Sequence, residues 1–398
     1  MLQVLGVLAF IFALLISVML HELGHFLTAK KYGMKVTEFF LGFGAKIWSF
    51  TRGETEFGVK AIPAGGYVRI VGMTPSEELS DEDQPRAFYK GRIRHRVITL
   101  AAGSIVHFIV GYILILLMLI FVGVGTFTAK LSYIGECVPA QNATSCAPSD
   151  AISPAKAAGL LVGDRIEKIN GVVVTDWASS TEIIRSSIGK PLDFDIVRDE
   201  NRVRLTVTPV NRVGVDGKSA GYIGIAPSFE YIRKNPIEAV PSAVNSVWQV
   251  AWVNLKGLVA VPAKIPDLWN QTFHGKARDT SGLVGVVGVA RVSGEAIGAE
   301  GLTWKDKASI FVSIVAGLNI FVGLFNALPL PPLDGGHIAV ALADRYRMWR
   351  AKRRGAPNPP AIDVARLTPI TLVVLAVLIS LSFLLLAADI INPLRLNS

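Results

Sequence analysis

The sequence predicts a polytopic α-helical membrane protein with four spans, a glycine-rich β-structure and one β-rich extracytoplasmic domain. Of its 398 residues, 51% are hydrophobic, a proportion too high for an ordinary soluble protein. Four apolar runs are long enough to cross the ~30 Å hydrocarbon core of a bilayer as helices. Lys and Arg cluster beside these runs, so the formal net charge of +9 indicates membrane topology and not the binding of nucleic acid.

The first span, residues 1–29, carries three polar side chains inside its apolar run, namely His21, Glu22 and His25. The run lacks a basic leader and a small-residue cleavage site, so we expect a retained helix and not a cleaved signal peptide. Imidazole and carboxylate groups are costly in hydrocarbon, and their presence there predicts a functional site. Positions i and i+4 of a helix share one face, so both imidazoles can bind one metal ion, while Glu22 can act as general base on water.

The following loop, residues 30–96, changes character over residues 40–73. Glycines such as Gly42 and Gly44 punctuate runs rich in Val, Ile, Tyr and Phe, a pattern typical of short strands and hairpins. Two interpretations are open for this β-structure. It is either a surface meander, or it dips toward the active site and offers an edge to which an unwound substrate adds as a strand.

The second span, residues 97–124, follows a cluster of basic residues that the positive-inside rule places in the cytoplasm. It contains His107, which could approach the metal. A lone His on such a helix more often hydrogen-bonds a neighbouring helix, and that is what we expect here.

The domain at residues 130–230 is more polar and is predicted to lie outside the membrane. Its AAGL…GD…ING pattern, within residues 157–171, resembles a PDZ domain, a fold that binds peptides by strand addition. Such a domain either captures a peptide end or only blocks access sterically. Cys137 and Cys146 lie here, where a disulfide is permitted and two free thiols are equally compatible with the sequence.

Residues 231–306 predict an amphipathic helix at the membrane interface and not a further span. Counting a span here would place the later basic cluster outside, against the charge rule. Four polar residues interrupt its apolar stretch: Asn245, Gln249, Asn254 and Lys256. Four glycines then predict a flexible approach to the next helix: Gly282, Gly285, Gly288 and Gly294.

The third span, residues 308–336, ends in NALPLPPLDG, where three prolines prevent a regular helix. Residues 337–366 are rich in Lys and Arg and are predicted as a cytoplasmic loop. The fourth span, residues 367–390, returns the chain to the outside, so both termini are predicted to lie there.

Asp334 is predicted to meet the histidines of the first span. His21 precedes the basic Lys30 by about 13 Å of helix, and Asp334 lies a similar number of residues before Arg345. Both spans run from outside to inside, so both clusters reach a similar depth. A carboxylate suits the third ligand position of a zinc ion held by two imidazoles, leaving the fourth for water. Asn326, just before the prolines, is expected to donate to an oxyanion or to an extended substrate.

Three features together resemble the site-2 protease family of intramembrane zinc metalloproteases: HELGH in the first span, NALPLPPLDGGH in a later span, and the PDZ-like domain between them. The likeness covers nearly the whole chain and is greatest to bacterial members that cleave anti-sigma factors, especially the actinobacterial type with one PDZ domain. It implies Zn²⁺ as cofactor with His21, His25 and Asp334 as ligands. It also implies that Glu22 is the catalytic base.

The same resemblance implies a membrane-reentrant position for the β-structure at residues 40–73 and membrane-docked helices within residues 231–306. It further implies four substrate-contacting residues: Asn326, Pro329, Gly42 and Gly44. One departure lies in the second span, where the family usually has AAGPxxN. This sequence has AAGSIVH, with Ser104 and His107.

The expected function is therefore hydrolysis of the transmembrane segments of single-pass regulators, such as anti-sigma factors, in a bacterial cytoplasmic membrane. The first cut in such a partner would be made by another protease. The alternative is a membrane metal transporter or sensor, which would use the same His, Glu and Asp side chains along a path through several helices and would need no catalytic water.

Overall fold

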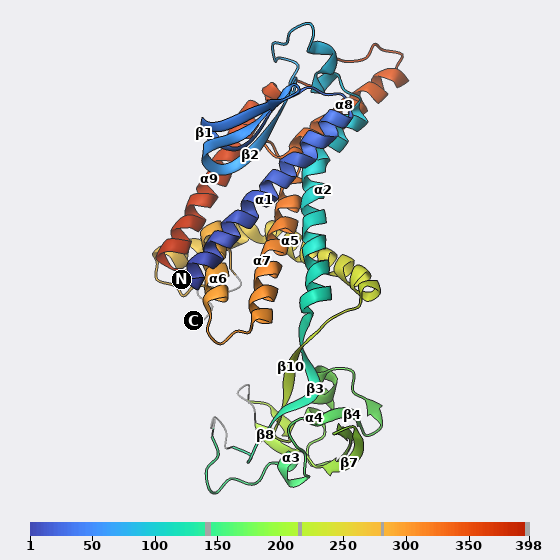
Figure 1. Ribbon diagram of the computed structural model, residues 1–398, viewed down its shortest axis with the longest axis vertical. Coiled ribbons are helices and arrows are strands. Elements are labelled where there is room, and N and C mark those ends of the chain that lie inside the picture. Colours follow the sequence, from blue (N-terminus) through green and yellow to red (C-terminus); the bar gives the residue numbers. More distant parts are fainter. Residues whose placement is uncertain (140–144, 214–216, 280–281, 395–398) are drawn as a thin grey trace. The chain divides into compact units, whose positions relative to one another are not determined.

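A computed structural model describes residues 1–139, 145–213, 217–279 and 282–394. The chain divides into two compact units (Figure 1). The first unit combines Met1–Val122 with Lys234–Ser398, and the second unit is Gly123–Arg233. The second unit is therefore an insertion between two helices of the first.

Four helices of the described residues are long and apolar enough to span a membrane, as predicted. Their bounds are α1 Leu2–Lys31, α2 Ile93–Leu117, α7 Trp304–Asn326 and α9 Thr368–Ile391. A π-helical turn, Met118–Val122, extends α2, and a 3₁₀ turn, Val364–Leu367, precedes α9. Three prolines follow Asn326, and α7 ends there because proline lacks the N–H that a helix needs.

Glycines let these helices pack closely. A Cβ atom at Gly24 of α1 would lie 2.9 Å from the carbonyl oxygen of Ala102 in α2. A Cβ atom at Gly6 would lie 2.9 Å from the Cα atom of Gly294. Close backbone approach at small residues is a main source of helix association in a bilayer.

The expectation of a flexible glycine-rich approach is wrong for part of its range. Helix α6, Val286–Gly298, contains both Gly288 and Gly294 and packs against α1. Its glycines serve close packing, since Gly294 abuts the carbonyl of Gln3. Periodicity alone does not distinguish a glycine that loosens the chain from one that admits a neighbouring helix.

The glycine-rich β-structure is one long antiparallel hairpin, β1 Val36–Arg52 and β2 Thr55–Ile70. Phe26 of α1 packs against Phe39 and Phe57 of the hairpin. Glu54 lies in the turn between β1 and β2 and accepts hydrogen bonds from Arg86 and Lys30. These cations lower the pKa of Glu54 to about 2. The hairpin is thus tied to both the side and the end of α1.

Helix α5, Pro236–Phe273, crosses α2 and α7 (Figure 1). It is not among the candidate spans, and it exposes large apolar side chains such as Trp248 and Trp252. Asn254 donates to the Gly317 carbonyl of α7 at 3.4 Å. These features agree with the predicted amphipathic character of the segment.

The basic stretch after Asp334 is not the predicted loop over its first part. It forms helix α8, Asp334–Arg353. The residues that suggested a cytoplasmic loop are mostly Arg and Lys, which are good helix formers when no proline intervenes. Helix α2 likewise begins at Ile93, before the predicted residue 97, because Arg96 is buried against Asp344 of α8 at 3.2 Å.

The second unit is built on a six-stranded sheet in its described residues, with the order β10-β3-β4-β6-β7 and β5 beside β4. The main strands are β3 Val124–Ile134, β4 Arg165–Ile169, β6 Leu192–Arg198, β7 Asn201–Val207 and β10 Ile225–Ile232. The smaller elements are α3 Pro154–Ala157, β5 Val172–Val173, α4 Trp177–Ser186, β8 Val210–Val213 and β9 Ser219–Tyr222. Phe194, Ile166 and Leu131 lie in its core. Cys137 and Cys146 form a disulfide, which decides between the two alternatives left open by the sequence.

Replacing Asp389 should destabilise the first unit. Asp389 of α9 pairs with Arg278 at 3.4 Å, with both side chains at most 5% exposed, and accepts a hydrogen bond from the Gly288 N–H. Asp389→Ala leaves the Arg278 charge buried and unpaired, so we expect the free energy of unfolding to fall by about 3–5 kcal/mol. Thermal unfolding in detergent measures this loss. The matched control is Asp267→Asn at the exposed pair with Lys276, which should change little, and equal effects would contradict the prediction.

Candidate metal centre

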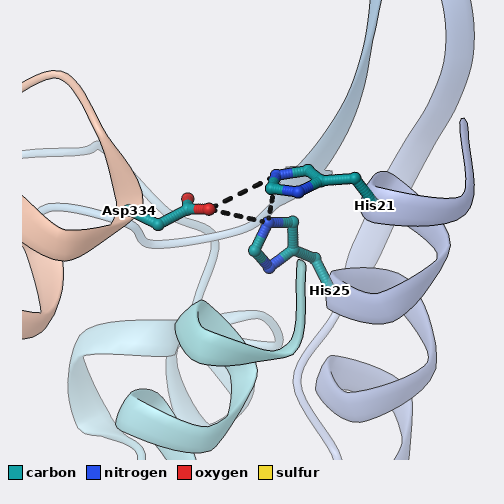
Figure 2. A group of neighbouring side chains, drawn as sticks. All are labelled: His21, His25 and Asp334. Carbon is teal, nitrogen blue, oxygen red and sulfur yellow. Dashed lines mark hydrogen bonds and ion pairs between the residues drawn. The ribbon is translucent and has the colours of Figure 1, made fainter. Parts of the chain in front are cut away.

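The side chains of His21, His25 and Asp334 meet at one point of the first unit (Figure 2). Both histidines lie on α1 and are at most 7% exposed. Asp334 is the first residue of α8. Its Oδ2 atom lies 3.3 Å from the Nε2 atom of each histidine, and the two Nε2 atoms are 3.1 Å apart. The predicted meeting of the two polar clusters is confirmed.

These distances fit a tetrahedral metal ion. Donor atoms placed tetrahedrally at ~2.0–2.1 Å from Zn²⁺ lie about 3.3 Å from one another. The buried Oδ2 atom of Asp334 receives no hydrogen bond among the described residues. Three lone-pair atoms at such a separation repel one another unless a cation lies between them. The donor set of two imidazoles and one carboxylate leaves a fourth position for water, as in catalytic zinc sites.

The backbone of α2 orients His25. The Nδ1 atom of His25 lies 2.7 Å from the carbonyl oxygen of Thr99. Only a protonated Nδ1 can donate to a carbonyl, so the Nε2 atom that faces Asp334 keeps its lone pair for a metal. The role of Thr99 was not predicted from the sequence, because a backbone carbonyl leaves no signal in the side-chain pattern.

Gly103 of α2 makes room for the two imidazoles. A Cβ atom at this position would lie 2.5 Å from both the Cε1 atom of His21 and the Nε2 atom of His25. Any side chain there would displace the two predicted ligands. Gly103 belongs to the AAGSIVH sequence, in which only Ser104 and His107 were noted as departures, so its role was not predicted.

A tight turn delivers Asp334. The chain between α7 and α8 contains Pro329, and the two glycines after Asp334 pack directly on this turn. A Cβ atom at Gly335 would lie 2.2 Å from the carbonyl oxygen of Leu328, and one at Gly336 would lie 2.7 Å from the Pro331 nitrogen. The glycine pair therefore allows α8 to start where its first carboxylate faces α1.

Glu22 lies beside the cluster and faces the hairpin. Its side chain is half-buried. A Cβ atom at Gly66 of β2 would lie 3.4 Å from the Cγ atom of Glu22 and 2.9 Å from the sulfur of Met19. Strand β2 thus passes directly over the acidic residue of the HExxH sequence, where a carboxylate next to a metal can accept a proton from water.

His107 belongs to a second polar group, which joins three helices. Its Nδ1 atom lies 2.9 Å from the Oδ1 atom of Asn319 in α7, and Asn319 donates to Ser17 of α1 at 3.0 Å. The predicted hydrogen bond of His107 to a neighbouring helix is confirmed. The ring centres of His107 and His21 are 4.9 Å apart. This second polar group therefore packs against the metal-binding cluster of His21, His25 and Asp334. Asn319 was missed because it lies in an apolar run without a motif.

The four residues predicted to contact substrate make no described hydrogen bond to His21, His25 or Asp334. Asn326 is the last residue of α7 and is half-buried, and Pro329 is exposed in the following turn. Gly42 and Gly44 lie in β1 with φ of +87° and +84°, a conformation that favours glycine. A Cβ atom at Gly42 would also lie 2.7 Å from the Ile62 carbonyl of β2. None of the four has a described hydrogen bond to a cluster residue.

Comparison with known proteins identifies the family. Residues 9–358 match the model of Peptidase family M50. The zinc metalloprotease Rip1 of Mycolicibacterium smegmatis is 36% identical, over 98% of each chain. Rip1 of Mycobacterium tuberculosis is 33% identical over the whole of both chains, and a putative zinc metalloprotease of a Nostoc species is 29% identical over 90% of each.

These matches decide between the two functions considered. A transporter predicts metal ligands distributed along a path, whereas the described residues contain a single group with metal-binding geometry. The enzyme interpretation and the zinc cofactor are confirmed. The chain belongs to peptidase family M50, as a membrane zinc metalloprotease of the site-2 protease type.

Proposed function

We propose that this protein hydrolyses a peptide bond in or near the transmembrane helix of single-pass membrane proteins, such as membrane-tethered anti-sigma factors. Another protease would first remove most of the partner's outer part. One observation carries the proposal: the two histidines of the metal-binding cluster lie within a candidate membrane-spanning helix. A hydrolytic site there reaches peptide bonds that a soluble protease does not.

Glu22 is the proposed general base. His21, His25 and Asp334 would hold Zn²⁺, which when bound would supply Lewis-acid chemistry toward the scissile carbonyl and water. The carboxylate of Glu22 takes a proton from the attacking water and later delivers it to the leaving nitrogen. The carbonyl of Thr99 holds the Nδ1 proton of His25 and so presents its other nitrogen as a ligand.

The substrate is proposed to bind as an extended segment beside α1. Hydrogen bonds occupy the carbonyls of a helical substrate, so local unwinding precedes hydrolysis. A cavity of about 340 Å³ between α1 and β1 is lined only by apolar side chains, among them Met19, Leu23 and Phe39. Such a surface suits the side chains of a membrane segment, and the neighbouring hairpin offers backbone groups for strand addition.

Four residues are proposed to help hold that extended segment. The amide of Asn326 would donate to the substrate backbone or to the developing oxyanion. Pro329 shapes the turn that follows it. Gly42 and Gly44 let β1 bend close to β2, and this bend would keep the hairpin edge within reach of a substrate in a membrane-reentrant position.

The second unit is proposed to be a PDZ-like filter outside a bacterial cytoplasmic membrane. The basic clusters before α2 and along α8 support an orientation with the metal centre toward the cytoplasm and both termini outside. The bulk of the second unit would exclude partners that still carry large outer domains. Anchoring in the bilayer already brings the substrate close to the protease. Capture of a trimmed end by strand addition is therefore the less favoured role of the second unit.

Glu22→Gln should abolish proteolysis while zinc stays bound. The amide keeps the shape of the carboxylate but does not take up the proton, so we expect turnover to fall by a factor of about 100 or more. Zinc content of the purified protein and accumulation of trimmed membrane-tethered fragments in cells measure the two properties together. Glu78→Gln, in an exposed loop, is the matched control. Wild-type turnover by Glu22→Gln would contradict the mechanism.

Asp334→Asn should weaken zinc binding. The substitution removes the only carboxylate of the cluster, and we expect the dissociation constant for zinc to rise about 100-fold or more, since loss of even an outer hydrogen-bond partner costs 10–100-fold. Competition with a chelator of known affinity gives the constant. The exposed Asp81→Asn controls for the change in net charge. An unchanged affinity would exclude Asp334 as a ligand.

Replacing residues 130–230 by a flexible linker should permit cleavage of untrimmed partners. The linker variant keeps the helices and the metal-binding cluster, while it removes the proposed steric barrier. Full-length and trimmed forms of one cleaved partner are assayed side by side, with zinc content as the test of folding. If the zinc-loaded variant still does not cleave the full-length form, residues 130–230 do not act as a steric filter. Weaker cleavage of the trimmed form would indicate that these residues capture the substrate.

A further inference from the structure

A cavity of about 480 Å³ lies where α2 begins, against the middle of α8. We call it the basic cavity. Its polar lining consists mainly of Lys90, Arg92, Arg94, Arg96, Asp344 and Arg345. It lies at the start of a candidate span, Ile93–Val122, and therefore at the level where that helix leaves the hydrocarbon and lipid headgroups begin.

The charges around this cavity are not balanced. Five of its lining side chains are basic and one is acidic. The single carboxylate, Asp344, is already engaged with Arg96 at 3.2 Å and with the backbone N–H of Ile362 at 2.8 Å. The exposed Arg94 and Arg345 have no ion pair among the described residues. A bound anion would compensate these cations.

One buried donor and an uncapped helix start also lie at the cavity. Arg96 is 5% exposed, and its Nε atom has no hydrogen-bond partner among the described residues. Helix α2 begins here without a side-chain cap at Arg92, so the first N–H groups of a long helix add partial positive charge. A phosphate is the anion that such an uncapped helix start accommodates best.

The remaining lining is mainly apolar and distinguishes a lipid from a free anion. Ile93, Met348, Pro359 and Ala361 form this apolar part, beside Tyr89 and Gly91. A free phosphate has no use for apolar contacts, and an acidic peptide would bring backbone groups that these side chains cannot satisfy. A phospholipid presents a phosphate joined to a glycerol backbone and acyl chains, so it matches both kinds of wall.

We propose that the basic cavity binds the headgroup of an anionic phospholipid. The phosphate would sit between Arg94, Arg345 and the start of α2, and the glycerol region would lie against the apolar wall. Bound lipid would join the first turn of α2 to α8, the helix that begins with Asp334. Basic pockets between helices at the cytoplasmic boundary of a membrane are suited to such headgroups.

The test is a lipid titration of the full-length, delipidated protein in detergent, followed by native mass spectrometry. Short-chain phosphatidylglycerol should bind at one saturable site, and phosphatidylcholine should not. The double variant Arg94→Gln/Arg345→Gln should bind about 25-fold more weakly, since each basic residue near a membrane surface contributes about fivefold. Its control, Arg350→Gln/Lys352→Gln, removes the same number of charges from α8 outside the cavity lining and should keep wild-type affinity.

A second readout is thermal stability. Phosphatidylglycerol should raise the melting temperature of the wild type and of the control variant, and the rise should be lost in Arg94→Gln/Arg345→Gln. Because Arg94 and Arg345 are exposed, the lipid-free melting temperature should stay unchanged. Equal weakening by both double variants would overturn the proposal in favour of diffuse attraction. Displacement of the lipid by millimolar inorganic phosphate, or by a polyglutamate peptide, would overturn it in favour of a free anion or a peptide.

Discussion

Three lone-pair donors facing one another are the constraint on which the rest of the first unit depends. The Nε2 atoms of His21 and His25 and the Oδ2 atom of Asp334 lie within 3.3 Å of each other, in a bundle of largely apolar helices. Such atoms are costly to bury unless a cation compensates them. The neighbouring backbone meets this condition: Thr99 fixes the tautomer of one imidazole, and Gly103 leaves space for both. The protein thus prepares the metal site with parts of three helices, none of which forms the site alone.

Other buried polar pairs in the same unit have a different effect. They join segments that are distant in sequence, and the partners of each pair lie mainly within the protein. Removing one partner of such a pair is expected to lower the free energy of unfolding far more than removing an exposed charge. The remaining group stays buried, where water cannot replace the lost partner. These pairs are His107 with Asn319, Arg96 with Asp344, and Arg278 with Asp389.

Helix α1 connects metal binding with the proposed substrate binding. One side of it carries the histidines, which face α2 and α8, and another side packs against the hairpin. Glu22 lies between these two sides, next to Gly66 of β2. A proton acceptor at this position can serve a water molecule at the metal while an extended segment lies along the hairpin. The proposed lipid site is connected to the metal-binding cluster through α8, because this helix lines the lipid site and begins with Asp334.

The sequence by itself determined the four candidate membrane-spanning helices, the β-hairpin character of residues 40–73 and the residues of the metal-binding cluster, because the signals for these are local. Run length, the i, i+4 spacing of His21 and His25, and proline chemistry before Asp334 act over a few residues. Only the tertiary structure decided the features that depend on close approach. Charge alone did not show that the basic stretch after Asp334 is helical, since its helix is stabilised by the buried contact with α2. The role of Gly103 was not predictable from the sequence either. The lack of a Cβ atom matters there only because α1 places two imidazoles against this position of α2.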